Sequence, residues 1–361
     1  MAGLADAGRS PVTATGVRVF VLSPARREYL ASVLAPIARG LASQFGADRI
    51  HVSTGWRFGP HFDLRAQAHQ GRPIDWEGVA VALAQGTRRY PVPAGTSEEA
   101  YLRTATMLGQ MEAVPPPYLP RHPHGHTELL AADTSPVWQG RLGALRSAGL
   151  THLFAPLTQA AATVGEGPLL ARVAEAFLAL ADTHPHGMAF GAFSFRSHAE
   201  AFFHWAGPLA DYRSSFDNRM GKDRAVLEEL VKRVRDSRES GPATEWRNAF
   251  NSCRADFAGQ VTGEDLDRAT PPAAGPARRA EGTSAFHTAV AASGVIDEPP
   301  SWFAGYRLTI NLFYELLPAL DISPVRRFYL CHAVAEGVDT VFGETWQTRL
   351  AAVEAHLAGS R

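Results

Sequence analysis

The chain has 361 residues, 45% of them hydrophobic, and its 35 Lys and Arg against 36 Asp and Glu give a formal net charge of -1. This balance argues against a protein that coats nucleic acid or an anionic membrane, because both attract a net basic surface. The sequence contains no run of about 18 apolar residues, so we expect no membrane span. The N-terminus lacks the basic start and apolar core of a secretory signal.

Alternating and helical hydrophobic patterns predict the elements of the N-terminal half. Residues 1–16 are expected to be a flexible tail, and residues 17–361 one compact unit. The predicted elements are strands at 17–21, 50–54 and 62–66, helices at 25–45, 75–85, 97–111, 140–164 and 168–182, and an extended proline-rich strap at 113–126. Because the second and third strands flank a short turn, they predict an antiparallel hairpin. The expected fold class is α+β, with antiparallel sheets packed by helices.

The C-terminal half is expected to be mostly helical, with two extended segments. Small residues at 187–195 predict a strand, a helix is expected to begin near Ser197, and residues 301–312 are predicted to be extended. Further helices are predicted at 227–234, 313–320 and 324–342, the last with Ser323 as N-cap and Gly343 as C-cap. The Pro-, Ala- and Gly-rich residues 268–282 are the expected linker and the place of any subdomain break.

Motifs that assign common chemistries are absent from the sequence. There is no GxxxxGK[ST] loop, no GxGxxG helix start, no HExxH, no CxxC pair and no GxSxG elbow, which weakens nucleotide, zinc and serine chemistry. The two cysteines, Cys253 and Cys331, are too few for a disulfide framework. We expect them to be small apolar fillers in a reducing cytoplasm.

Three histidines alternate in the proline-rich strap, at His122, His124 and His126. In an extended chain their imidazoles would point one way, as a metal site requires. Pro123 and Gly125 interrupt such a strand, however, and no cysteine lies nearby to complete a site. We therefore expect an exposed polar loop rather than a metal site, with substrate contact as the other alternative.

Ser197 and Glu200 have the spacing of a capping box, so the start of a helix explains both residues structurally. His198 would then occupy the first helical position, where free N–H groups disfavour a positive charge. A neutral imidazole there suits proton transfer near neutral pH. The alternative is an ordinary surface histidine.

Two further groups of residues are candidates for substrate contact. Aromatic residues cluster around Trp302, Tyr306 and Tyr314. Such clusters more often pack in the core than bind a ligand, but the tyrosine hydroxyls need hydrogen-bond partners if they are buried. In the hairpin, strand periodicity places His61, Asp63 and Arg65 on one face. Arg65 is expected to anchor a substrate carbonyl or a structural carboxylate, and a plain Asp63–Arg65 pair on a sheet surface is the alternative.

Three fragments together resemble one enzyme family. Residues 50–65, ending in GPHFDLR, resemble the RYxxxGPHLRLR hairpin of the lanthipeptide dehydratase small domain, the glutamate-elimination module. The SFRSHAEAFF segment at 194–203 resembles the SHAE stretch of stand-alone thiopeptide relatives. Residues 311–320 with 323–332 resemble the terminal helix pair of that family, so the resemblance spans about residues 17–342.

Departures from the elimination module indicate a different reaction. The position of its first hairpin arginine falls near Ser53 and Thr54, its next arginine is replaced by Asp63, and its late histidine by Asn311. A site without these cations and this base should bind a glutamyl ester poorly. The resemblance is therefore to the pyridine synthase branch. Its members join two dehydroalanines of a thiopeptide precursor by a formal 4+2 aza-cycloaddition and release water and the leader peptide.

The resemblance implies a substrate and a set of site residues. The partner is expected to be a ribosomally made precursor peptide with a leader and a dehydrated, azole-containing core, and the chemistry needs no metal or redox cofactor. We expect no nucleic acid or membrane partner, a cytoplasmic location, and a monomer or homodimer. The expected catalytic residues are His198, Tyr314, Tyr306 and Ser197, and the expected substrate-binding residues are His61, Asp63, Arg65, Arg196, Trp302 and Asn311.

Two alternatives stay open at this point. One is a glutamate-eliminating lyase of the same fold, and the other is a non-catalytic scaffold that binds leader peptides. The three functions differ in their products, because the cyclase releases water and an intact leader amide, the lyase releases glutamate, and the scaffold changes no mass.

Overall fold

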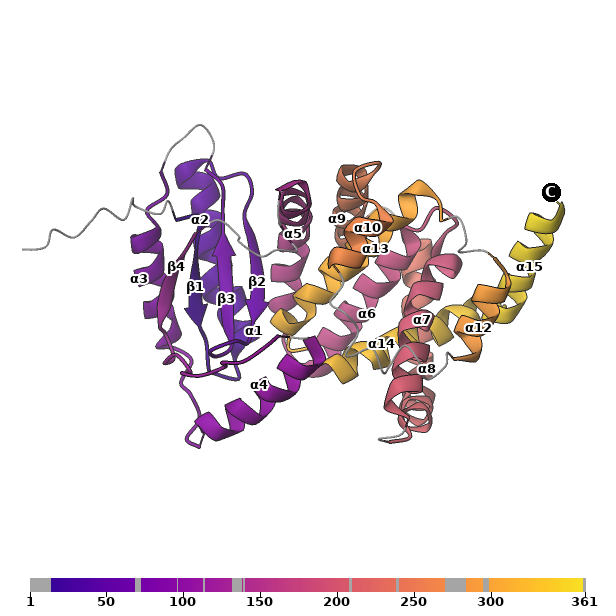
Figure 1. Cartoon of the computed structure of the whole chain (residues 1–361), viewed down its shortest axis with the longest axis horizontal. Coiled ribbons are helices and arrows are strands. Elements are labelled where there is room, and N and C mark those ends of the chain that lie inside the picture. The colour runs from indigo at the N-terminus through magenta and orange to yellow at the C-terminus, as the bar shows by residue number, and fades with distance from the viewer. Residues whose placement is uncertain are drawn as a thin grey trace, which may run out of the picture. The chain divides into compact units, whose positions relative to one another are not determined.

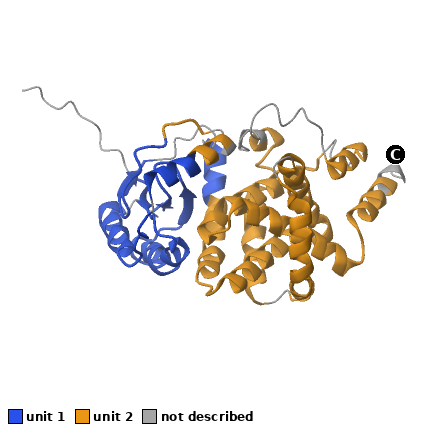
Figure 2. Cartoon of the chain, turned by 90° about the horizontal axis from the view of Figure 1, so that it is seen from below, with its two compact units in different colours: residues 1–105, 118–147 blue, residues 106–117, 148–361 orange. Residues whose placement is uncertain are grey.

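The computed structural model describes residues 14–68, 73–95, 97–112, 114–131, 138, 140–207, 210–237, 240–269, 284–294 and 299–359. The chain divides into two compact units, unit 1 (residues 1–105 and 118–147) and unit 2 (residues 106–117 and 148–361), coloured separately in Figure 2. From the sequence we expected one compact unit over residues 17–361, with any subdomain break at 268–282. Most of that linker, residues 270–282, and the tail up to residue 13 lie outside the described residues.

Unit 1 is built on a four-stranded antiparallel sheet with the order β2-β3-β1-β4 (Figure 1). Its elements are β1 (Gly16–Phe20), α1 (Arg26–Tyr29), a π-helical segment (Leu30–Leu34), α2 (Ala35–Phe45), β2 (His51–Gly55), β3 (His61–Arg65), α3 (Trp76–Thr87), the N-terminal part of α4 (Glu98–Glu112), β4 (Thr127–Leu130) and the N-terminal part of α5 (Gly140–Ala161). Val17, Val19, Phe62 and Leu64 are fully buried, and α3 packs against β1 and β4. The predicted hairpin and the apolar face of the sheet are thus confirmed.

The end of the proline-rich strap is held against β1 and the turn between β2 and β3 by backbone hydrogen bonds. The N–H of Gly125 donates to the carbonyl of Phe20 at 2.9 Å, the N–H of Phe20 donates to the carbonyl of His126 at 2.9 Å, and the N–H of His122 donates to the carbonyl of Phe58 at 2.8 Å. The strap leads directly into β4, which the sequence analysis did not predict. The sequence TELL of β4 lacks alternating polarity, so pairing with β1 defines the strand.

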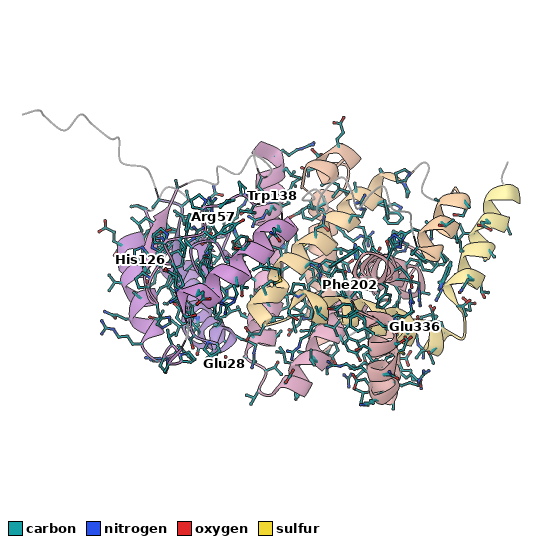
Figure 3. All side chains as sticks on the ribbon, turned by 60° about the horizontal axis from the view of Figure 1, so that its bottom comes forward. Glu28, Arg57, His126, Trp138, Phe202 and Glu336 are labelled. Carbon is teal, nitrogen blue, oxygen red and sulfur yellow. The ribbon has the colours of Figure 1, made fainter. Side chains whose placement is uncertain are left out.

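Unit 2 is helical. Its elements are the C-terminal part of α5 (Gly140–Ala161), α6 (Glu166–Asp182), α7 (Met188–Ala206), α8 (Tyr212–Asp236), α9 (Pro242–Phe257), α10 (Gly263–Ala269), α12 (Ala285–Ala292), α13 (Ser301–Leu316), a 3-10 turn (Leu317–Leu320), α14 (Pro324–Phe342) and α15 (Trp346–Gly359). Helix α7 packs against α6, α8 and α14. At this junction Phe202, labelled in Figure 3, stacks on Phe328 with ring centroids 4.4 Å apart. The predicted N-cap is confirmed, because Ser323 Oγ accepts a hydrogen bond from the N–H of Arg326.

The two segments predicted to be extended, 187–195 and 301–312, are helical. They belong to α7 and α13. In α7 the buried residues recur at three- and four-residue steps, and its small residues serve close helix packing rather than a strand. A Cβ on Gly191 would lie 2.1 Å from the carbonyl oxygen of Ala181 in α6, so only glycine permits this approach.

Two expectations from composition can be compared with the structure. Within the described residues, no helix has both the length and the hydropathy needed to cross a bilayer. Cys253 and Cys331 are buried and unbonded to each other, as expected for packing residues.

Candidate active site

The structure brings together the two residues assigned to proton chemistry. His198 Nδ1 lies 2.9 Å from the hydroxyl of Tyr314, so α7 and α13 meet at this hydrogen bond. The two rings are edge-to-face, with centroids 5.2 Å apart. Both residues are intermediate in exposure.

The local reason for the position of His198 differs from the expected one. Ser197 does not cap a helix, because α7 begins at Met188 and Ser197 lies in its interior. The free N–H groups of a helix start are therefore remote from His198. Instead, burial is the largest cause that lowers the pKa of His198 to about 3, and the nearby charges of Arg327 and Arg307 contribute to the same shift. The imidazole is neutral at pH 7, as predicted, but for a different physical reason.

The predicted extended segment 301–312 and helix 313–320 would place Tyr314 at the junction of a strand and a helix, but it is an interior residue of α13. Its hydroxyl lies 3.2 Å from Cys331 Sγ in α14, so the phenol links the imidazole to a thiol. Burial raises the pKa of Tyr314 well above 10 and that of Cys331 to about 12. The phenol and the thiol therefore both keep their protons at neutral pH, and a neutral imidazole has one nitrogen free to accept the phenol proton.

A cation lies against this pair. The guanidinium carbon of Arg327 is 4.9 Å from the ring centroid of Tyr314 and 4.6 Å from that of Phe328. Its Nε is buried and has no hydrogen-bond partner within the described part of the chain. Arg327 was not among the candidate residues from the sequence, and Cys331 was expected only as a small apolar filler. Their four-residue spacing places them on one face of α14, but helical periodicity cannot show that this face meets Tyr314.

Ser197 contacts a histidine other than His198. Its Oγ lies 2.9 Å from His287 Nε2, while His287 Nδ1 lies 2.8 Å from Ser284 Oγ at the start of α12. His287 also contributes to the lowered pKa of His198. Ser197 is thus one helical position away from His198 but supports the neighbouring imidazole of His287.

Tyr306 and Trp302 form a separate aromatic group on α13. Tyr306 is fully buried and its hydroxyl donates to the carbonyl of Gly191 at 3.4 Å. Trp302 packs edge-to-face on His184 with centroids 4.9 Å apart. These contacts give Tyr306 a structural role in joining α13 to α7. Asn311 is partly exposed one helical turn before Tyr314.

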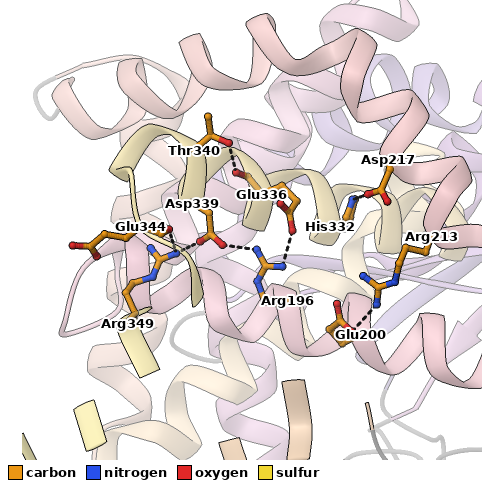
Figure 4. A network of polar contacts seen from close by, with 10 residues as sticks. All are labelled: Arg196, Glu200, Arg213, Asp217, His332, Glu336, Asp339, Thr340, Glu344 and Arg349. Atoms are coloured by element: carbon orange, nitrogen blue, oxygen red, sulfur yellow. Dashed lines mark hydrogen bonds and ion pairs between the residues drawn. The ribbon is translucent and has the colours of Figure 1, made fainter. Parts of the chain in front are cut away.

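Arg196 is held in a network of ion pairs (Figure 4). Its guanidinium donates to Glu336 at 2.6 Å and to Asp339 at 2.7 Å, and Asp339 also pairs with Arg349. Arg196 is 5% exposed, so two carboxylates of α14 already satisfy it. This geometry favours a structural role over the expected substrate binding.

The hairpin residues lie in unit 1, and their partners are largely structural. Asp63 forms a bidentate pair with Arg18, at 2.8 and 2.9 Å. His61 is buried with Nδ1 2.8 Å from the carbonyl of Gly59, and burial lowers its pKa to about 4. Arg65 donates to Thr15 Oγ1 at 2.8 Å and to the carbonyl of Ala131 at 2.7 Å, and the Asp63–Arg65 pair considered from the sequence is replaced by Asp63–Arg18.

Arg65 also lines a groove of about 900 Å³ in unit 1. Its lining combines arginines, indole rings and the carboxylates of Asp75 and Glu77, and among its other residues are Arg49, His51, Arg65, Trp76, Trp138 and Arg146. The guanidinium of Arg146 lies 5.2 Å from the ring of Trp138, which Figure 3 labels. The sequence analysis identified only Arg65 here, because the remaining residues come from separate elements.

Comparison with known proteins gives matches among solved structures. No family model matches the chain, and no curated protein sequence matches it. The fold is similar to that of TbtD, described as the pyridine synthase from thiomuracin biosynthesis, with a TM-score of 0.70 and 21% identity over 91% of this chain and 98% of that one. It is also similar to TsrL, with a TM-score of 0.59 and 16% identity over 94% of this chain and 97% of that one. The expected resemblance and the α+β class are confirmed at the level of the fold.

Proposed function

We propose that this protein is a pyridine-forming macrocyclase that acts on a ribosomally made thiopeptide precursor. The observation that carries the proposal is the 2.9 Å contact between His198 and Tyr314, which pairs a neutral base with a phenolic acid. The shared fold with TbtD, a pyridine synthase by its description, supports the same class of reaction. In this proposal two dehydroalanines combine in a formal 4+2 aza-cycloaddition, and water and the leader peptide leave.

The first step requires an amide of the substrate to become a 2-azadiene, which moves one proton from nitrogen to oxygen. Tyr314 donates its proton to the amide oxygen, His198 accepts the proton from the amide nitrogen, and the contact between them returns that proton to the phenol. No charge accumulates on the phenol, which its raised pKa would oppose. In each of the two later eliminations the pair takes one proton from the new ring and supplies one to the leaving group, first the hydroxyl and then the leader amide, so that it ends in its starting state.

Arg327 has a role in this proposal that the sequence did not indicate. Its cation lies over the ring of Tyr314, and its buried Nε lacks an acceptor within the described residues. A substrate carbonyl placed beside Tyr314 would supply one. We assign Arg327 to orienting the reacting amide. Because this amide becomes the azadiene, its orientation holds the two alkenes in contact, which lowers the barrier by up to about 7–11 kcal/mol.

The leader is assigned to unit 1. The groove there offers arginines for carboxylates or carbonyls of a peptide and indole rings for its apolar side chains. Remote binding of this kind positions the reacting residues. Calorimetry with the isolated leader is expected to show binding that Arg146→Ala weakens and Tyr314→Phe leaves unchanged. An absence of binding up to millimolar leader would contradict this part of the proposal.

Mass spectrometry with a doubly dehydrated, azole-containing precursor tests the reaction itself. The proposal predicts loss of water and release of an intact leader amide. A Tyr314→Phe protein is the matched control, because it keeps the ring and removes only the hydroxyl. Loss of glutamate from a glutamylated precursor would instead establish a lyase, and an unchanged precursor that still binds would establish a scaffold.

A further inference from the structure

The end of the strap carries a cluster of possible metal ligands that the proposed reaction does not use. His122 Nε2 lies 3.2 Å from Glu128 Oε1, and His126 Nε2 lies 3.7 Å from the same oxygen. The ligand atoms of these three residues all lie within 4.8 Å of one another. The two imidazoles are parallel, with centroids 4.5 Å apart and planes inclined by 7°. Both side chains thus present one nitrogen to the same carboxylate.

We propose that His122, His126 and Glu128 bind a divalent transition-metal ion of the zinc class. Zn²⁺ holds imidazole nitrogen and carboxylate oxygen at about 2.0–2.2 Å, which places neighbouring tetrahedral ligands about 3.3 Å apart. The separations of 3.2 and 3.7 Å are close to this value. Mg²⁺ and Ca²⁺ prefer sets made of oxygen alone, so the two imidazoles select the transition metals.

The backbone brings the three side chains together before any ion binds, and the two imidazoles, which are parallel in this structure, rotate so that both nitrogens face the ion. His126 directly precedes β4 and Glu128 lies within it, so their two-residue spacing places them on one face. The carbonyl of His126 accepts from Phe20 N–H, and His122 N–H donates to the carbonyl of Phe58. A turn closed by the N–H of His126 on the carbonyl of Pro123, at 3.1 Å, brings His122 back over the strand.

His124, the third histidine of the alternating pattern, does not belong to this cluster. His124 points elsewhere, since its Nδ1 accepts from the N–H of Leu22 at 3.1 Å and its Nε2 lies 3.2 Å from the carbonyl of Thr87. Glu128 takes its place and supplies a negative charge, which a dication favours. The alternating histidines therefore predicted the site only in part.

Neighbouring charges permit a cation here. Arg18 is the nearby positive group, but its guanidinium is engaged by both oxygens of Asp63 at 2.8 and 2.9 Å. It lies 3.8 Å from Glu128 Oε2, whereas the imidazoles lie near Oε1. The side chains of His122, His126 and Glu128 are 28, 38 and 34% exposed, so water has access to the remaining coordination positions.

Titration of the chelator-treated, tag-free full chain with ZnCl2 in a calorimeter tests this proposal. We expect one equivalent of Zn²⁺ to bind, MgCl2 to give no heat of binding, and Glu128→Gln and His126→Ala each to weaken Zn²⁺ binding by more than about 10-fold. The matched control is His186→Ala. It removes an imidazole that also pairs with another histidine, His184, with centroids 5.6 Å apart, and it should leave Zn²⁺ affinity unchanged.

A second readout separates ligation from loss of structure. Co²⁺ bound to this set should give the visible absorption of a low-symmetry nitrogen and oxygen site, and Glu128→Gln, which preserves the shape of the side chain, should abolish it. The proposal is overturned if no saturable Zn²⁺ binding occurs up to millimolar metal. It is equally overturned if Glu128→Gln binds like the parent protein, or if His186→Ala weakens binding as much as His126→Ala. A poorly folded His126→Ala protein leaves Glu128→Gln to decide the question.

Discussion

The hydroxyl of Tyr314 lies 2.9 Å from His198 Nδ1, although 116 positions separate the two residues in the sequence. The contact joins α13 to α7 and continues to Cys331 on α14, so three helices contribute to one proton-bearing group. A phenol and an imidazole that both stay neutral at pH 7 form an acid and a base in direct contact.

Removing either member of the pair should reduce turnover strongly. Tyr314→Phe and His198→Ala are each expected to lower the rate of pyridine formation by about 10²–10⁴-fold, the usual contribution of one acid–base group. Tyr306→Phe is the control, because that hydroxyl bonds the carbonyl of Gly191 and should affect stability more than rate. Single-turnover mass spectrometry measures the effect. Parental rates in both variants would show that other groups or water move the protons.

The charge of Arg327 should control the protonation of His198. Arg327→Met removes a cation that lowers the pKa of His198, so this pKa is expected to rise from about 3 while burial keeps it below 6.5. Arg326→Met is the matched control, since that neighbour pairs with Glu166 on α6. Titration of the imidazole resonance by NMR measures both variants, and an equal response in the two would contradict a local effect of Arg327.

Two glycine substitutions should have opposite effects on stability. Gly191→Ala places a Cβ 2.1 Å from the carbonyl oxygen of Ala181 and is expected to destabilise the protein by about 1–3 kcal/mol or more, because α6 and α7 must move apart. Gly221→Ala lies within α8, where an added Cβ meets no atom within 4 Å. It should stabilise by about 0.5–1 kcal/mol through lower backbone entropy in the unfolded chain. Denaturant midpoints compare the two, and a stabilising Gly191→Ala would refute the packing argument.

The carboxylate of Asp339 should be important for stability. It lies between Arg196 and Arg349, whose side chains are 6 and 3% exposed, so Asp339→Asn leaves two enclosed cations with reduced compensation (Figure 4). We expect a loss of about 3 kcal/mol. Arg103→Gln removes an arginine 67% exposed and paired with Glu99, and it should change little. Thermal or urea unfolding measures both, and equal effects would mean that burial does not strengthen the network.

Acid should destabilise unit 1 through its enclosed histidines. Burial lowers the pKa of His51 to about 3 and that of His61 to about 4, both below the value of about 6.5 in an unfolded chain. Between the folded-state pKa values and about 6.5, the unfolded chain therefore binds more protons than the folded protein. The free energy of unfolding is highest above pH 6.5 and falls as the pH drops toward 4. Each histidine contributes a slope of about 1.4 kcal/mol per pH unit in that window.

His51→Gln should remove one proton from this linkage and flatten the dependence of stability on pH. Urea midpoints measured from pH 7.5 to 4.5 give the slope directly. His204→Gln, which removes an exposed imidazole, is the comparison. A slope that His51→Gln leaves unchanged would assign the acid sensitivity to other groups.

Local patterns in the sequence determined much of this protein. The alternation of Val17 and Val19, the hairpin at 50–66 and the Ser323 cap all follow from interactions within a few residues, and the structure agrees with them. The motif resemblance identified the fold, as well as His198 and Tyr314 as candidates. These features were readable because hydrophobic periodicity and capping depend on neighbours along the chain.

Tertiary packing decided the rest. The small residues Gly191 and Ala192 predicted a strand from the sequence, but in the structure Gly191 packs closely against α6. Strand β4 forms because its backbone pairs with β1. For the same reason, the sequence could not predict which side chains contact one another. Arg196 meets Asp339 and Glu128 replaces His124 beside His126 only when separate segments fold together, since spacing along a chain defines a shared face but not what that face contacts.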